Sequence, residues 1–147
     1  NGTAPSTYGP IPQAQESDYV SDVQKENPYP FSTSKAKDLL TSHGWEGQGG
    51  TMVCTDPGTS DSQCGEGVKD GTKFTMGVLS QSGSTVTDNM MSAIQSSLAK
   101  TGIGFTIKTA PVSSVLSQTP TCTSDEASCK WDLSFFGTAG SWYFRAS

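Results

Sequence analysis

The sequence predicts an α/β fold with a βαβαβ core, in which helices flank a mainly parallel sheet. Two observations support this. Short β-rich segments alternate with helical segments between residues 73 and 137. Each helical segment also begins or ends at a residue suited to capping. Strands that alternate with helices form parallel βαβ units, and their right-handed crossovers leave few arrangements.

Three strands are expected, at residues 73–80, 103–110 and 130–137. The first shows alternation and β-rich content, and the third is rich in aromatic residues. We place residues 73–80 in the centre of the sheet, with the other two strands on either side. The carboxyl ends of all three would then lie at one edge.

The clearest helix is expected at residues 85–101, with Ser84 as its N-cap and Gly102 at its end. A shorter helix follows at 111–118, begun by Pro111. The apolar face of the long helix consists of residues that recur every four positions, with Ala93 and Met91 beside them: Val86, Met90, Ile94 and Leu98.

An earlier helix is expected at residues 33–43, ended by Gly44 in the left-handed conformation, with Trp45 folding back as an apolar anchor. One face of this helix carries Ala36, Leu39, Leu40 and His43. Residues 46–72 read as a long polar loop. Loops of that length are uncommon unless they are functional or tied down.

The length supports one domain with a modest core. Residues 1–30 form a proline-rich arm, expected to pack on an α/β lobe made of residues 31–147. Within the arm, Tyr19 and Val23 would share one side of a short helix. No apolar run approaches the roughly 18 residues that span a bilayer.

The formal net charge is −5, and Arg145 is the only arginine. A nucleic-acid-binding protein usually shows a basic stripe, so that class is excluded. Ser and Thr together make up 40 of the 147 residues, while charged residues reach only 16%. A polar surface with so little charge favours a secreted protein.

Four cysteines form two close pairs, Cys54 with Cys64 and Cys122 with Cys129. Three disulfide connectivities are possible. We favour the two local bridges, because each would staple a loop with little core of its own. Structural zinc sites prefer C-x₂₋₄-C spacing, which neither pair has. Disulfides imply an oxidising, extracytoplasmic compartment.

Catalytic and metal-binding signals are weak. There is no G-x-S-x-G motif, and the lone His43 is better explained as a packed or capping residue than as a base. Asp56, Asp61 and Glu66 share one loop but miss the calcium-loop spacing, so a solvated loop is the better interpretation. We expect no cofactor, no metal and no catalysis.

Binding signals gather where the strands end, since ligands of open α/β sheets meet the carboxyl edge. The QSGS segment before the long helix could form an anion cradle or an ordinary capped turn. Small and aromatic residues after the last strand would allow close approach and stacking, or simply pack on the core. The candidate ligand-binding residues are Ser80, Gln81, Ser82, Phe136, Gly137, Thr138, Trp142 and Tyr143.

Four blocks in order resemble the family 5 extracellular solute-binding proteins, the receptors of peptide and oligopeptide ABC importers. The first is GPIP, a proline-rich approach segment. The others are NPYPFSTSKAKDLLTSHGW at residues 27–45, the strand–helix–strand stretch at 73–111, and KWDLSFFGTAGSW at 130–142. The two cystine loops look like insertions of actinobacterial-type members.

The resemblance implies one lobe of a two-lobed, periplasmic-binding-protein-like (type II) fold. Such a receptor would be an extracellular monomer that closes around a small solute, possibly a peptide, and presents it to a membrane permease. Its lipid-anchoring cysteine would lie upstream of residue 1.

In peptide-binding members, an aspartate in the turn after the strand matching 130–137 pairs with the amino terminus of the ligand. Here the stretch from Gly137 to Trp142 has no carboxylate, which disfavours a free peptide amino terminus as ligand. Two other classes stay open. A cell-surface adhesion domain would show an exposed aromatic patch. A secreted hydrolase would bring Asp88, Asp132 and His43 into one cleft.

Overall fold

A computed structural model of the chain describes residues 22–118 and 131–137. The chain divides into two compact units, residues 1–32 and residues 33–147. In the first unit the described part contains helix α1 (Asp22–Lys25), where Val23 is exposed. The Lys25 ammonium donates a 2.8 Å hydrogen bond to the Asp22 carboxylate, and this bond and the positive charge lower the pKa of Asp22. Tyr19 lies outside the described residues.

The second unit contains the predicted three-stranded sheet. Strand β3 (Thr75–Gln81) lies in the centre, and both β4 (Gly104–Ala110) and β5 (Leu133–Phe135) pair with it in parallel. The predicted strand order is therefore confirmed. Strand β5 is much shorter than the predicted 130–137, because it pairs with β3 at only three positions.

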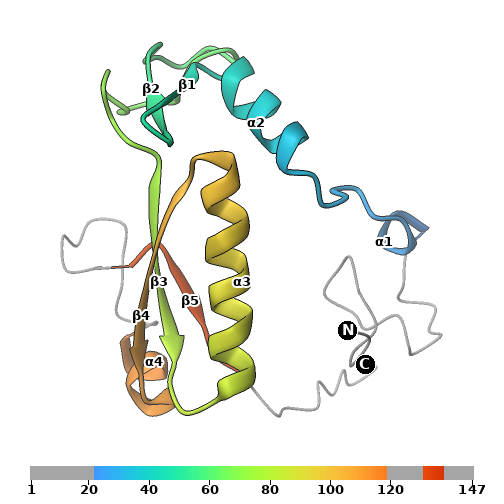
Figure 1. The fold of residues 1–147 in the computed structure, drawn as a ribbon, viewed down its shortest axis with the longest axis vertical. Helices are drawn as coiled ribbons and strands as arrows, with labels where there is room; N and C mark the ends of the chain where they lie inside the picture. The colour runs from blue at the N-terminus through green and yellow to red at the C-terminus, as the bar shows by residue number, and fades with distance from the viewer. Residues whose placement is uncertain (1–21, 119–130, 138–147) are drawn as a thin grey trace, which may run out of the picture. The chain divides into compact units, whose positions relative to one another are not determined.

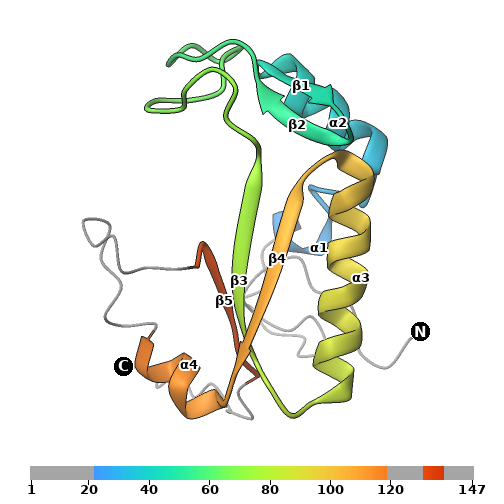
Figure 2. The ribbon, with the colours of Figure 1, turned by 60° about the vertical axis from the view of Figure 1, so that its left-hand side comes forward.

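Two helices cover the sheet, α3 (Thr85–Thr101) and α4 (Val112–Gln118). They lie on opposite faces of it (Figures 1 and 2). The predicted caps of α3 are confirmed: the Ser84 hydroxyl accepts from the backbone N–H of Thr87, and Gly102 has φ of 83°. Gly102 N–H bonds back to the carbonyl of Ala99, which satisfies one of the last helical acceptors.

The predicted apolar face of α3 is wrong. Its buried residues are Thr87, Met91 and Thr101, whereas Val86 is 79% exposed. Met90 and Ile94 are also exposed, and Leu98 is half-buried. The helix packs on β4 with the flank of its apolar stripe, because the four-residue repeat drifts around a helix of 3.6 residues per turn.

The prediction that residues 46–72 form one long loop is also wrong. Strands β1 (Trp45–Gln48) and β2 (Thr51–Cys54) form an antiparallel hairpin there. The turn residues Gly49 and Gly50 have φ of 59° and 85°. A two-residue turn with both φ positive matches the twist of paired strands, and glycine adopts it without steric cost.

The hairpin builds a small core beside the sheet. Trp45, Met52 and Cys54 are buried, with Leu40 and Phe74 packed against them. The rings of Trp45 and Phe74 meet edge-to-face at 4.8 Å between centroids. Trp45 is therefore the anchor that the sequence predicts.

The predicted Cys54–Cys64 disulfide is present, with 5.9 Å between the Cα atoms. It ties the loop after β2 to the buried end of that strand, where Cys54 has no exposed surface. The second predicted bridge, Cys122–Cys129, lies outside the described residues.

Helix α2 (Thr33–Ser42) confirms the first predicted helix, and Gly44 follows it with φ of 77°. The predicted face is only partly correct: Leu40 packs on the small core, but Leu39 is 61% exposed. Helix α2 packs against both β1 and α3, and Leu40 is the leucine of this face that reaches the small core. Across residues 22–118 and 131–137, no helix has the length and apolar character needed to cross a membrane.

Candidate functional site

The carboxyl ends of the three parallel strands form the candidate site. Strand β3 ends at Gln81, β4 at Ala110 and β5 at Phe135. The backbone N–H of Ser82 donates to the carbonyl of Ala110 at 2.8 Å, which holds the ends of β3 and β4 together. We call the described segments 80–84, 109–111 and 135–137 the carboxyl edge.

A side chain joins the other two strands at this edge. The backbone N–H of Gly137, two residues beyond β5, donates to Oε1 of Gln81 at 2.8 Å. The pairing of β3 with β5 ends at Ser80 and Phe135, so this bond extends the connection beyond the backbone ladder. The hydrogen bond thus joins two segments, 80–82 and 136–137, that the sequence predicts separately as ligand-binding.

The other described candidates have different surroundings. Ser80 is 1% exposed, and within the described part of the chain its buried hydroxyl has no hydrogen-bond partner. Phe136 is half-buried, while Ser82 and Gly137 are exposed. Three further candidates, Thr138, Trp142 and Tyr143, lie outside the described residues.

The connections between the strands reverse direction between β3 and β5. The chain leaves β3 through α3 to β4 on one side, then crosses by α4 and residues 119–132 to β5 on the other. In doubly wound sheets, ligands bind outside the carboxyl ends at the point where the order reverses. Gln81 and Gly137 lie at that point.

The carboxyl edge is polar and uncharged. Every residue of segments 80–84, 109–111 and 135–137 has a neutral side chain, mostly serine, threonine, glutamine or an apolar group. The edge can therefore offer hydroxyl, amide and backbone hydrogen bonds. These three segments offer no charged side chain to an ionic group.

Asp132 is a residue whose role the sequence did not reveal. The predicted strand 130–137 includes Asp132, but in the structure Asp132 precedes β5. Its carboxylate accepts a 2.6 Å hydrogen bond from the backbone N–H of Gly77. The backbone N–H of Asp132 donates in turn to the carbonyl of Gly77 at 2.8 Å. The sequence holds no local signal for this bond, because it joins residues 55 positions apart.

Two of the three residues proposed for hydrolysis, Asp132 and His43, have partners of their own. Asp132 bonds to Gly77, the imidazole Nδ1 of His43 contacts the carbonyl of Asp61, and Asp88 lies in the first turn of α3. Within the described ranges, no group of three or more potential ligands is arranged to hold a metal ion.

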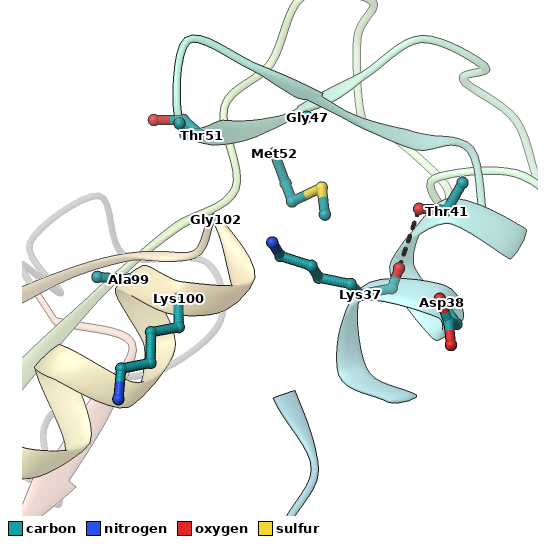
Figure 3. Close-up of a pocket in the computed structure, with 10 residues that line it drawn as sticks. Lys37, Asp38, Thr41, Gly47, Thr51, Met52, Ala99, Lys100 and Gly102 are labelled. Atoms are coloured by element: carbon teal, nitrogen blue, oxygen red, sulfur yellow. Dashed lines mark hydrogen bonds between the residues drawn. The ribbon is translucent and has the colours of Figure 1, made fainter. Parts of the chain in front are cut away.

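A pocket of about 400 Å³ lies at the opposite end of the sheet, near the start of β4. It is lined by α2, the hairpin and the last turn of α3, and none of the candidate residues takes part. Lys37 extends from α2 toward Met52 and Gly102 (Figure 3). A cation near a helix carboxyl terminus interacts favourably with its free carbonyls, so we interpret Lys37 as supporting α3.

Comparison with known protein families identifies the class. Residues 1–146 match the model of the bacterial extracellular solute-binding proteins, family 5, middle region. The match covers nearly the whole chain, so the chain belongs to this family. The resemblance noted in the sequence is confirmed. No curated protein matches the chain.

Among solved structures, the chain is similar to the oligopeptide-binding protein AppA from Bacillus subtilis, solved in complex with a nonapeptide. The sequence identity is 22% and the TM-score is 0.47. The similarity covers 60% of this chain but only 15% of that protein. The chain thus spans a small part of that protein's length.

Proposed function

We propose that the chain is one lobe of the extracellular substrate-binding protein of an ABC importer. It would bind a peptide or another small solute and deliver it to a membrane permease. Family membership supports the class, and the bond between Gln81 and Gly137 at the carboxyl edge supports the position of the site. The edge offers hydrogen-bonding groups where the connections reverse between β3 and β5, as a solute-binding surface requires.

In this proposal the solute is enclosed between this lobe and a second one. Contacts to both lobes would favour the closed state, since a ligand shifts an equilibrium by its differential affinity for two states. The full-length receptor would act as a monomer without catalysis. A lipid anchor upstream of residue 1 would tether it outside the cell.

Thermal melting of the full-length protein with a panel of peptides and sugars tests the function. A bound solute stabilises the folded state by about 2.7 kcal/mol at a concentration 100 times its Kd, so the melting temperature rises. If no peptide or sugar raises it, the proposed function is wrong.

Two matched variants test the position of the site. Ser82→Trp places a bulky ring on the exposed carboxyl edge, whereas Ser96→Trp places the same ring on an exposed position of α3. We expect Ser82→Trp to abolish the solute-induced rise in melting temperature and Ser96→Trp to preserve it. If the solute raises the melting temperature of both variants equally, the binding site does not lie at this edge.

A further inference from the structure

We propose that Gln81 determines specificity at this site, with its amide Nε2 donating a hydrogen bond to a neutral acceptor oxygen of the solute. The acceptor is an amide carbonyl or a hydroxyl. This inference rests on the proposed function, because it assigns a ligand chemistry to the same edge.

The bond to Gly137 fixes the orientation of the Gln81 amide. The backbone N–H of Gly137 is a donor, so the atom 2.8 Å from it must be the oxygen Oε1. The nitrogen Nε2 then points elsewhere, and it has no partner among the described residues. The side chain is half-buried.

Gly137 leaves room beside that nitrogen. A Cβ atom added at Gly137 would lie 3.6 Å from Nε2 and 3.8 Å from Oε1 of Gln81. Gly137 is exposed and has no positive φ, so its backbone does not demand glycine. A side chain at this position would occupy space next to the amide group of Gln81.

The donor works in neutral surroundings. No side chain in segments 80–84, 109–111 and 135–137 carries a charge, so a carboxylate or an ammonium group of the solute would find no oppositely charged side chain there. A neutral oxygen matches an amide N–H at little desolvation cost. The group of the solute that faces Gln81 is therefore uncharged.

The test uses the full-length protein and isothermal titration calorimetry with three probes. These are tetraalanine blocked at both termini, unblocked tetraalanine, and maltotriose. The two neutral probes separate a carbonyl acceptor from a hydroxyl acceptor. We expect the wild-type protein to bind blocked tetraalanine or maltotriose.

The variant Gln81→Glu keeps an oxygen for Gly137 but replaces the donor with an acceptor. It should weaken binding of the neutral probe about tenfold at pH 7. Binding should recover as pH falls through the ordinary glutamic acid range near 4.3, because the protonated acid donates again. The control Gln48→Glu adds the same charge at an exposed position of β1 and should stay within about twofold of wild type.

If Gln81→Glu does not fold, a second variant tests the same inference. Gly137→Ala keeps the backbone bond and adds a methyl group in van der Waals contact with the Gln81 amide, where the solute would approach, so it should weaken binding without lowering the melting temperature of the free protein. The inference is wrong if Gln81→Glu binds the neutral probe as tightly as the wild-type protein does. It is also wrong if the wild-type protein binds only unblocked tetraalanine. Either result would leave the proposed function standing. Failure to bind any of the panel of solutes would instead count against the function itself.

Discussion

Asp132 and Gly77 exchange two hydrogen bonds at the start of β5. The Asp132 carboxylate accepts from the Gly77 N–H at 2.6 Å, and the Asp132 N–H donates to the Gly77 carbonyl at 2.8 Å. Only three residue pairs join β5 to β3, so this exchange makes up a large part of their connection. It fixes the register that brings Gly137 to Gln81 at the other end.

We predict that Asp132→Ala weakens both the fold and the site. The lost side-chain bond should lower the free energy of unfolding by about 1 kcal/mol, since Asp132 is exposed and its bond competes with water. Urea denaturation measures this change. Solute affinity should fall as well, because β5 positions Gly137. Asp132→Asn retains an acceptor oxygen, so its stability and solute affinity should fall less. Equal losses of stability and affinity in both variants would argue against the hydrogen bond as the cause.

The turn after α2 gives a prediction about backbone strain. Gly44 has φ of 77°, and an added Cβ would lie 2.9 Å from the carbonyl oxygen of Asp56. Gly44→Ala should therefore cost at least about 2 kcal/mol of stability, from the left-handed backbone and the clash. In the control Gly47→Ala, the new Cβ meets nothing within 4 Å. Thermal melting that shows the same loss in both variants would contradict this account.

The disulfide should contribute to stability through the loop it closes. Replacing Cys54 and Cys64 together by alanine should lower the free energy of unfolding by about 2.5–3 kcal/mol in the chain-entropy model. Cys54 is fully buried, so some loss of packing adds to this. Denaturation under non-reducing conditions measures it. Mass spectrometry of a non-reducing digest should link Cys54 to Cys64, and the sequence-based prediction links Cys122 to Cys129.

The N-cap of α3 provides a local test. Ser84→Ala removes the acceptor for the Thr87 N–H and should cost about 1 kcal/mol. Ser92, inside the same helix, donates only to the carbonyl of Asp88 on an exposed face. Ser92→Ala should be close to neutral, because alanine is the better helix former. If only Ser92→Ala lowers the stability of the protein, Ser84 does not act as the N-cap of α3.

Sequence alone determined the three strands of the parallel sheet and the helices between them, but not the hairpin of β1 and β2. Ser84 and Gly102 end α3 through their own side chain and backbone conformations, which neighbours in sequence largely dictate. The parallel order with β3 in the centre followed from the alternation of strands and helices. The family was also recognisable from blocks of residues spread along the chain.

Only the tertiary structure decided which side chains meet. The repeat of Val86, Met90 and Ile94 marked an apolar stripe, but α3 buries other residues in its place. The bonds of Gln81 to Gly137 and of Asp132 to Gly77 span more than fifty residues, and no local pattern encodes them. Such contacts depend on strand register in three dimensions, because a shift by one residue turns each side chain to the opposite face.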